Sequence, residues 1–185
     1  LLDNNEKKLR QTLKDQRSKR ELLNQQIQDF ILKSFSTYDD ISRKLDKVNP
    51  FEQKRGFHIW PLEGGQVISR YGMQEHGEIA GIQINNLGID IVSNDVNQVK
   101  SIASGTVVDI NDSNPNDITI IVEHDFNYFS IYSHLEKVLV RDAQIISESQ
   151  ILGHLANSNN EHFRLHLEIR KGRETLNPIQ WLKKN

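Results

Sequence analysis

Three short stretches of the chain carry side chains that could bind a metal ion or transfer a proton. NNLGIDI contains Asp90, FSIYSHL contains His134, and RLHLEIR contains His166. Imidazole and carboxylate groups are common zinc ligands and common general acids and bases. Taken singly these residues are ordinary, because solvent alone favours polar side chains on the outer face of a strand. Their chemical meaning depends on whether the fold brings them together.

The alternation of side chains along a strand predicts which of these residues share a face. In NNLGIDI, Asp90 lies between two isoleucines and should point away from the core. In FSIYSHL, we expect Ser130, Tyr132 and His134 to share one face. In RLHLEIR the apolar residues should face the core, and the opposite face then carries Arg164, His166, Glu168 and Arg170.

Residues 49–185 have the composition of an antiparallel β domain. Short runs rich in β-branched and aromatic residues alternate with clusters of turn-forming residues. Near the end, Asn177 and Pro178 have the types expected for an N-cap and a first helical residue. We therefore expect a final helical turn that packs Trp181 and Leu182 onto the sheet.

Residues 1–48 predict a helical arm. The segment has no Gly or Pro, and Lys, Glu, Gln and Leu are good helix formers. Leu2, Leu9, Leu23 and Phe30 repeat every seven residues, which favours the end of a coiled coil. The alternative is a helix that packs against its own domain.

A second, short helix is expected after the long one. Ser36 and Asp39 have the spacing of a capping box, and Ile41 and Leu45 would supply a small apolar face. The predicted fold class is thus α+β: a coiled-coil-type helix and a short helix, followed by a mainly antiparallel β domain.

The overall composition excludes several function classes. The chain has 185 residues, enough for one full-sized domain with an appendage. With 23 Lys and Arg against 25 Asp and Glu, it has no basic surplus for binding nucleic acid. It also has no cysteine, which fits a bacterial periplasm among other compartments. Because the sequence begins with Leu, we expect an export signal or anchor outside it, and a periplasmic or cell-envelope location.

The order of motifs in the β half resembles the LytM or lysostaphin-like metallopeptidase domain. The resemblance runs from WPLEGGQVISRYG through LGIDI, IIVEH and YSHL to RLHLEI and NPIQWL. In that family, the three zinc-ligand positions correspond to Asn86, Asp90 and His166. The two catalytic histidine positions correspond to His134 and Arg164.

Two of these five positions therefore lack the histidine that the family carries. The amide of Asn86 is a poor zinc ligand compared with imidazole. Arg164 has no lone pair to accept a proton, and its permanent charge repels a divalent ion. The resemblance thus implies a domain without metal, cofactor or hydrolytic activity, in which Asp90, His134 and His166 are vestigial. We also expect Asp90, Arg164 and His166 to form a charge-paired cluster.

One further departure concerns turns. The family has two glycines where RDAQIISESQILG has Ala143 and Ser149, so we expect these turns to be reshaped.

A helical arm followed by a degenerate LytM domain resembles the EnvC-like murein hydrolase activators. The resemblance implies a non-catalytic activator of peptidoglycan amidases in bacterial cell separation, with the arm docking on a division-associated ABC-transporter complex. The alternatives are a peptidoglycan-binding module without hydrolysis and an active zinc endopeptidase. The expected partner-binding groove consists of Asn86, Asp90, Tyr132, His134, Arg164 and His166.

Overall fold

The computed structural model describes residues 2–42, 50–75, 83–114, 117–125, 127–158 and 162–184. The chain divides into two compact units, residues 1–45 and 46–185. Within the described part, neither helix combines the length and the apolar character that a membrane span requires.

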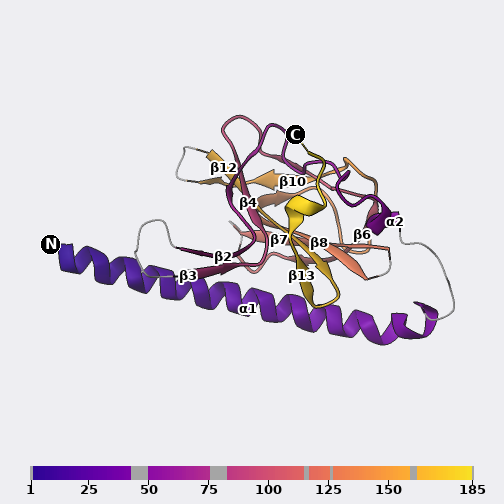
Figure 1. Cartoon of the computed structure of the whole chain (residues 1–185), viewed down its shortest axis with the longest axis horizontal. Coiled ribbons are helices and arrows are strands. Elements are labelled where there is room, and N and C mark those ends of the chain that lie inside the picture. The colour runs from indigo at the N-terminus through magenta and orange to yellow at the C-terminus, as the bar shows by residue number, and fades with distance from the viewer. Residues whose placement is uncertain are drawn as a thin grey trace. The chain divides into compact units, whose positions relative to one another are not determined.

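The first unit contains one long helix, α1 (Leu2–Ser42) (Figure 1). Pairs four residues apart, such as Arg17 and Glu21 at 3.5 Å, support its polar surface. The predicted separate helix beginning near Ser36 is wrong over the described residues, because α1 continues without a break to Ser42. Neither Gly nor Pro occurs between Ser36 and Ser42, so no helix-breaking residue interrupts α1 there. Residues 43–49, including Leu45, lie outside the described residues, and coiled-coil pairing of α1 stays a prediction.

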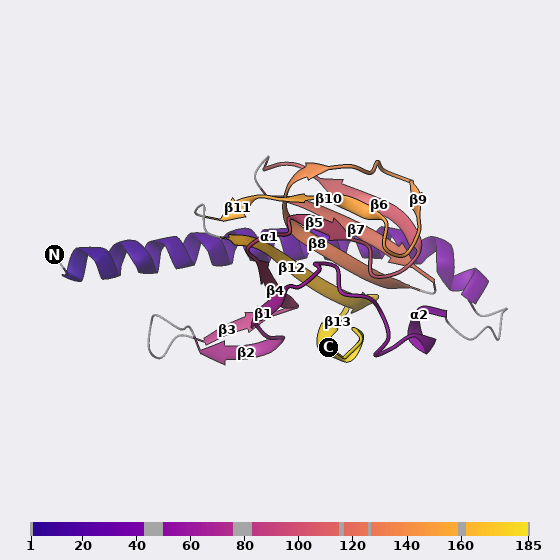
Figure 2. The ribbon, with the colours of Figure 1, turned by 90° about the horizontal axis from the view of Figure 1, so that it is seen from above.

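The second unit confirms the predicted antiparallel β domain. It opens with the short helix α2 (Pro50–Gln53), and its paired strands run antiparallel in both described sheets. The main sheet follows the order β1 (Gln66–Ser69), β4 (Ile89–Ser93), β12 (His162–Lys171), β8 (Tyr128–Val138), β7 (Ile118–His124), β6 (Gly105–Asn111) and β9 (Ile145–Ile146) (Figure 2). Attached to this path are β5 (Gln98–Lys100), β10 (Ile151–Leu155), β11 (Asn157–Ser158) and β13 (Glu174–Leu176), and β2 (Gly72–Glu75) pairs separately with β3 (Gln83–Asn86).

The apolar core lies on one face of β4, β12 and β8. The inward residues of β4 and β12 match the alternation in the sequence, with members Ile89, Ile91, Leu165, Leu167 and Ile169. Trp181 and Leu182 complete the core after the short helix η1 (Pro178–Gln180). Asn177 caps η1 by accepting a hydrogen bond from the N–H of Ile179 at 3.1 Å, so the predicted final turn is confirmed.

Tyr132 lies in this core, and its predicted place beside His134 is wrong. Tyr132 stands opposite Leu167 in the β8–β12 ladder, and residues directly opposite one another share a face. Its hydroxyl accepts a hydrogen bond from the N–H of Ile102 at 3.0 Å and lies 2.9 Å from the Ser130 hydroxyl, which is also buried. Tyr132 therefore stabilises the domain and does not line the outer face.

The two turns expected to be reshaped keep a left-handed backbone. Ala143 has φ 59° and Ser149 has φ 68°, in the region that favours glycine. Both N–H groups still bond to the domain, that of Ala143 to the Val107 carbonyl at 2.9 Å and that of Ser149 to the Ser101 carbonyl at 3.0 Å. The surrounding hydrogen bonds thus hold the turns in place despite the side chains.

This strain predicts that glycine stabilises the protein at both turns. The left-handed conformation costs a non-glycine residue about 1–2 kcal/mol, and the larger unfolded-state entropy of glycine offsets roughly half of that. Ala143→Gly and Ser149→Gly should each raise the free energy of unfolding in urea by about 0.5–1 kcal/mol. Ala156→Gly is the control, since Ala156 has no positive φ and glycine should lower stability there. A loss of stability in all three variants would contradict this account.

Candidate functional site

The candidate site lies on the outer face of the sheet, where β4, β12 and β8 run side by side. His166 of β12 pairs with Asp90 of β4 on one side and with Ser133 of β8 on the other. Opposed residues of neighbouring strands have their side chains on the same face, close enough to interact. Asp90 and His166, which the alternation predicted to point outward, are therefore in direct contact.

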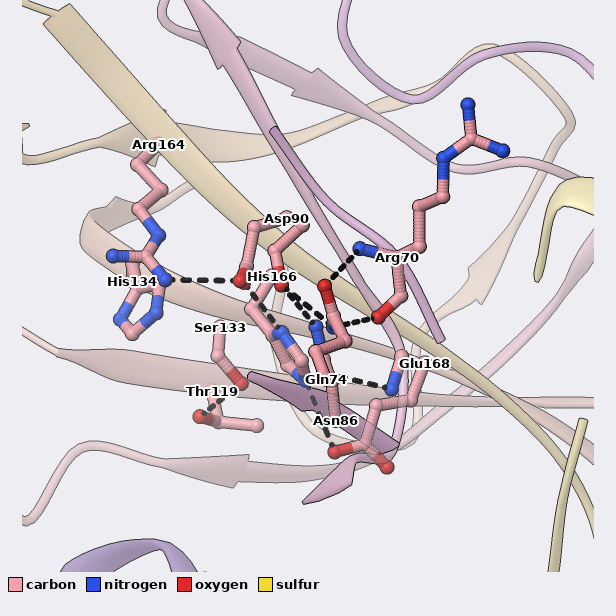
Figure 3. A network of polar contacts seen from close by, with 12 residues as sticks. Arg70, Gln74, Asn86, Asp90, Thr119, Ser133, His134, Arg164, His166 and Glu168 are labelled. Carbon is pink, nitrogen blue, oxygen red and sulfur yellow. Dashed lines mark hydrogen bonds and ion pairs between the residues drawn. The ribbon is translucent and has the colours of Figure 1, made fainter. Parts of the chain in front are cut away.

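Five side chains form a continuous row of alternating charge, here called the charge ladder, in the order Arg164, Asp90, His166, Glu168 and Arg170. Nη2 of Arg164 donates to Oδ2 of Asp90 at 2.9 Å, and Nδ1 of His166 lies 2.8 Å from Oδ1 of Asp90 (Figure 3). On its other side, Nε2 of His166 lies 3.2 Å from Oε1 of Glu168. Arg170 donates to Oε2 of Glu168 through Nε at 2.8 Å and Nη2 at 2.6 Å.

The geometry gives His166 a positive charge. Both ring nitrogens face carboxylate oxygens, which accept hydrogen bonds but do not donate them when ionised. Burial by itself lowers the pKa of His166, but the hydrogen bonds and charges of Asp90 and Glu168 outweigh burial and raise this pKa to about 9. As an imidazolium, His166 has no lone pair for a metal ion.

The two carboxylates of the ladder are held in the ionised form. Burial favours a raised pKa for Asp90, but His166 and Arg164 outweigh it and keep the pKa well below its usual value. Burial acts in the same direction on Glu168, where His166 and Arg170 lower the pKa to about 2. Each carboxylate thus lies between two cations, which compensates for its removal from water.

Asn86 lies at the end of β3 and its side chain is committed to local hydrogen bonds. Its Nδ2 donates to the Ser69 hydroxyl at 2.9 Å, and its Oδ1 accepts from the N–H of Gly88 at 3.1 Å. A Cβ at Gly88 would lie 2.1 Å from the carbonyl oxygen of Leu167, so glycine allows this loop to approach β12. Asn86 therefore shapes the site through its loop.

His134 reaches the site through an unusual backbone conformation. Because Ser133 occupies the outward position opposite His166, strict alternation would direct His134 to the other face. Its φ of 74° interrupts the alternation, and its ring centroid lies 6.3 Å from that of His166. Nδ1 of His134 lies 2.8 Å from Oδ1 of Asp117, a carboxylate that orients the ring. The side chain remains partly exposed.

These residues do not fit a zinc ion. Asp90 uses both oxygens in the ladder, and His166 uses both nitrogens. Oδ1 of Asn86 already accepts a backbone N–H. Within the described ranges no group of three His, Asp or Glu residues has the arrangement of a metal site. The side chains of the site are engaged in charge pairing and hydrogen bonding with one another.

Three participants were not singled out in the sequence as site residues. Glu168 and Arg170 were placed on the correct face, but their pairing with each other and with His166 required the side-chain geometry. Asp117 precedes β7 and lies 17 positions from His134, and no motif connects the two. An aspartate next to a turn is common, so the sequence did not indicate that Asp117 contacts His134.

The fold and the positions of Asp90, His134 and His166 define a class: the chain has the β domain of LytM-type metallopeptidases. Residues 84–178 match the model of peptidase family M23, and the chain belongs to this family. Lysostaphin, whose solution structure is known, shares 25% sequence identity with a TM-score of 0.53, covering 68% of this chain and 52% of lysostaphin.

Among curated proteins the chain is similar to murein hydrolase activators. It is 32% identical to the murein hydrolase activator NlpD of Escherichia coli over 124 residues, which is 66% of this chain and 30% of NlpD. It is 28% identical to the murein hydrolase activator EnvC of the same species over 129 residues, 69% of this chain and 29% of EnvC. The matches thus span less than a third of each relative.

Proposed function

We propose that this protein is a non-catalytic activator of peptidoglycan amidases that binds its amidase through the vestigial peptidase groove. The observation that carries the proposal is the charge ladder, in which Arg164 holds Oδ2 of Asp90, and Nδ1 of His166 is paired with Oδ1 of Asp90 where a metallopeptidase would bind zinc. The similarity to NlpD and EnvC, both named murein hydrolase activators, supports the direction of the proposal.

Loss of catalysis follows from two independent requirements. Zinc-dependent hydrolysis needs a Lewis acid to activate water and a base to move protons. Arg164 stands at one catalytic position and cannot accept a proton. Since Asp90 and His166 are already paired, the Lewis acid is missing for a separate reason. The groove, which we take to comprise Asn86, Asp90, His134, Arg164 and His166, then serves for binding.

The location and the role of α1 complete the proposal. Relatives that include an outer membrane antigenic lipoprotein of Haemophilus influenzae suggest that this protein works in the bacterial cell envelope, in the periplasm. We propose that α1 belongs to a coiled coil through which a division-associated ABC-transporter complex controls the activator during cell separation. The EnvC-like resemblance supports this part.

The proposal predicts stimulation of an amidase without intrinsic cleavage. Mixed with the amidases of its own organism and dye-labelled peptidoglycan, the protein should raise dye release roughly 5-fold or more, the range of typical coupling between two sites. The protein is first treated with EDTA and desalted, which should leave stimulation unchanged. By itself it should release no dye. Intrinsic cleavage, or no stimulation of any amidase, would refute the proposal.

A peptidoglycan-binding module without hydrolysis is the second candidate. The partly exposed guanidinium of Arg164 favours it, because a cation in a groove attracts anionic peptide stems. Cosedimentation with purified sacculi separates the two candidates. A binding module should sediment with sacculi and leave amidases unaffected. An active zinc endopeptidase ranks third, because it needs ligand atoms that the charge ladder already uses.

A further inference from the structure

The exposed end of the charge ladder is a guanidinium with unused hydrogen-bond donors. Among the described residues, Arg164 has one acceptor, Asp90, which takes a single N–H of Nη2. Its Nε is buried and has no hydrogen-bond acceptor among those residues. The guanidinium carries five N–H groups, and its edges match the two oxygens of a carboxylate. Because Nε is buried while the side chain is 38% exposed, Arg164 retains the capacity to bind a second carboxylate through its Nη groups.

The charges of the ladder do not cancel. Three cations, Arg164, His166 and Arg170, alternate with two carboxylates, Asp90 and Glu168. The Arg170 end is closed, since that side chain is 0% exposed, whereas the Arg164 side chain is 38% exposed. The excess positive charge is therefore accessible at Arg164. The carboxylate of Asp117 is paired with His134 at 2.8 Å.

We propose that Arg164 binds an acidic side chain of the amidase, an Asp or Glu, and that this charge pair sets the orientation of the complex. The inference rests on the proposed function and adds the chemistry of the partner. One partly exposed charge pair contributes more to specificity and association rate than to total affinity. A protein partner supplies the remaining contacts, which a free peptide carboxylate does not.

The test compares binding of the amidase to the full chain and to Arg164→Gln, together with Arg164→Lys and the exposed loop control Arg141→Gln. A partly exposed charge pair corresponds to up to roughly 5-fold in Kd, and to more when the partner covers it. Arg164→Gln should therefore weaken binding roughly 5-fold or more and flatten its dependence on salt. The Kd of Arg164→Lys should lie between those of the wild type and Arg164→Gln, and the Kd of Arg141→Gln should equal that of the wild type. Equal binding by Arg164→Gln, with an unchanged urea midpoint, would overturn the proposal.

A second measurement separates failure of this inference from failure of the proposed function. NMR spectra of the Arg164 Nε–H are recorded during titration with acetate and with acetyl-D-alanyl-D-alanine, a mimic of a peptidoglycan stem. If no amidase binds but both carboxylates shift this signal saturably, Arg164 is a carboxylate-binding site and the proposed activation of amidases is wrong. Preference for the dipeptide without amidase binding assigns the site to peptidoglycan and overturns the inference. No shift with either carboxylate overturns it as well.

Discussion

Replacing Asn86 and Arg164 together with histidine should turn the charge ladder into a zinc site. The Asn86→His change adds a nitrogen ligand beside Asp90, and the Arg164→His change removes the guanidinium that holds Oδ2 of Asp90 at 2.9 Å. His166 can then lose its Nδ1 proton to solvent and bind the metal ion through that nitrogen, while Nε2–H still donates to Glu168. A carboxylate behind a metal-bound histidine is a common supporting arrangement.

The expected gain in zinc affinity is large. Changes in residues that only support the ligands typically alter metal affinity by about 10–100-fold. Adding a ligand and freeing Asp90 should therefore raise zinc affinity by more than roughly 100-fold. After dialysis against trace zinc, the double variant should retain about one ion per chain by elemental analysis, and binding should release protons. The wild type should retain no stoichiometric zinc.

The single variants identify which defect dominates. Asn86→His leaves the guanidinium on Asp90, and Arg164→His leaves only Asp90 and His166 as strong ligands. Both should bind zinc more weakly than the double variant. If the wild type keeps one zinc per chain through dialysis with a chelator, the charge ladder is not the resting state of the site. That result would also remove the main support for a non-catalytic activator.

Glu168→Gln should produce the largest loss of stability. Glu168 is buried and accepts hydrogen bonds from Arg170 at 2.8 Å and 2.6 Å, with His166 at 3.2 Å. Glutamine keeps the shape but removes the charge, so two buried cations lose a counterion. Breaking a buried ion pair on one side typically costs about 3–5 kcal/mol. For a chain of this size the melting temperature should fall on the order of 10 °C.

The matched control makes the same substitution in a more exposed pair. Glu148 pairs with Lys54 at 2.7 Å, where the Lys54 side chain is 57% exposed. Glu148→Gln should change the free energy of unfolding by less than about 1 kcal/mol, as expected for surface pairs. Urea unfolding followed by the fluorescence of the buried Trp181 measures both variants. An equally small effect for Glu168→Gln would show that the ladder does not depend on its second carboxylate.

Much of the fold could be predicted because it depends on local patterns. The alternation in β4 and β12 placed Ile91 and Leu165 in the core and Asp90 and His166 outside it. Hydrophobic burial depends on that period of two, so the residue types alone are informative. The cap at Asn177 is equally local, since a side chain and a backbone N–H two residues away form it.

The sequence was less informative where the backbone leaves its regular course. β8 shows a register irregularity in its pairing with β7, and His134 has a positive φ. These features direct His134 to the outer face, whereas Tyr132 lies in the core through its regular pairing opposite Leu167. Neither conformation follows from residue types, because Tyr and His occur on both faces of strands. The same holds for Ala143 and Ser149, which keep a glycine-like backbone through contacts made elsewhere.

By itself, the sequence determined which residue types stand in the three motifs, and their resemblance to the family led us to expect that two histidines are replaced. Only the tertiary structure decided what the replaced positions do. Arg164 and Asp90 are 74 positions apart, and Asp117 and His134 are 17 apart, so strand pairing alone brings them into contact. A charge acquires its role from the charges around it, and in this domain those neighbours come from distant parts of the chain.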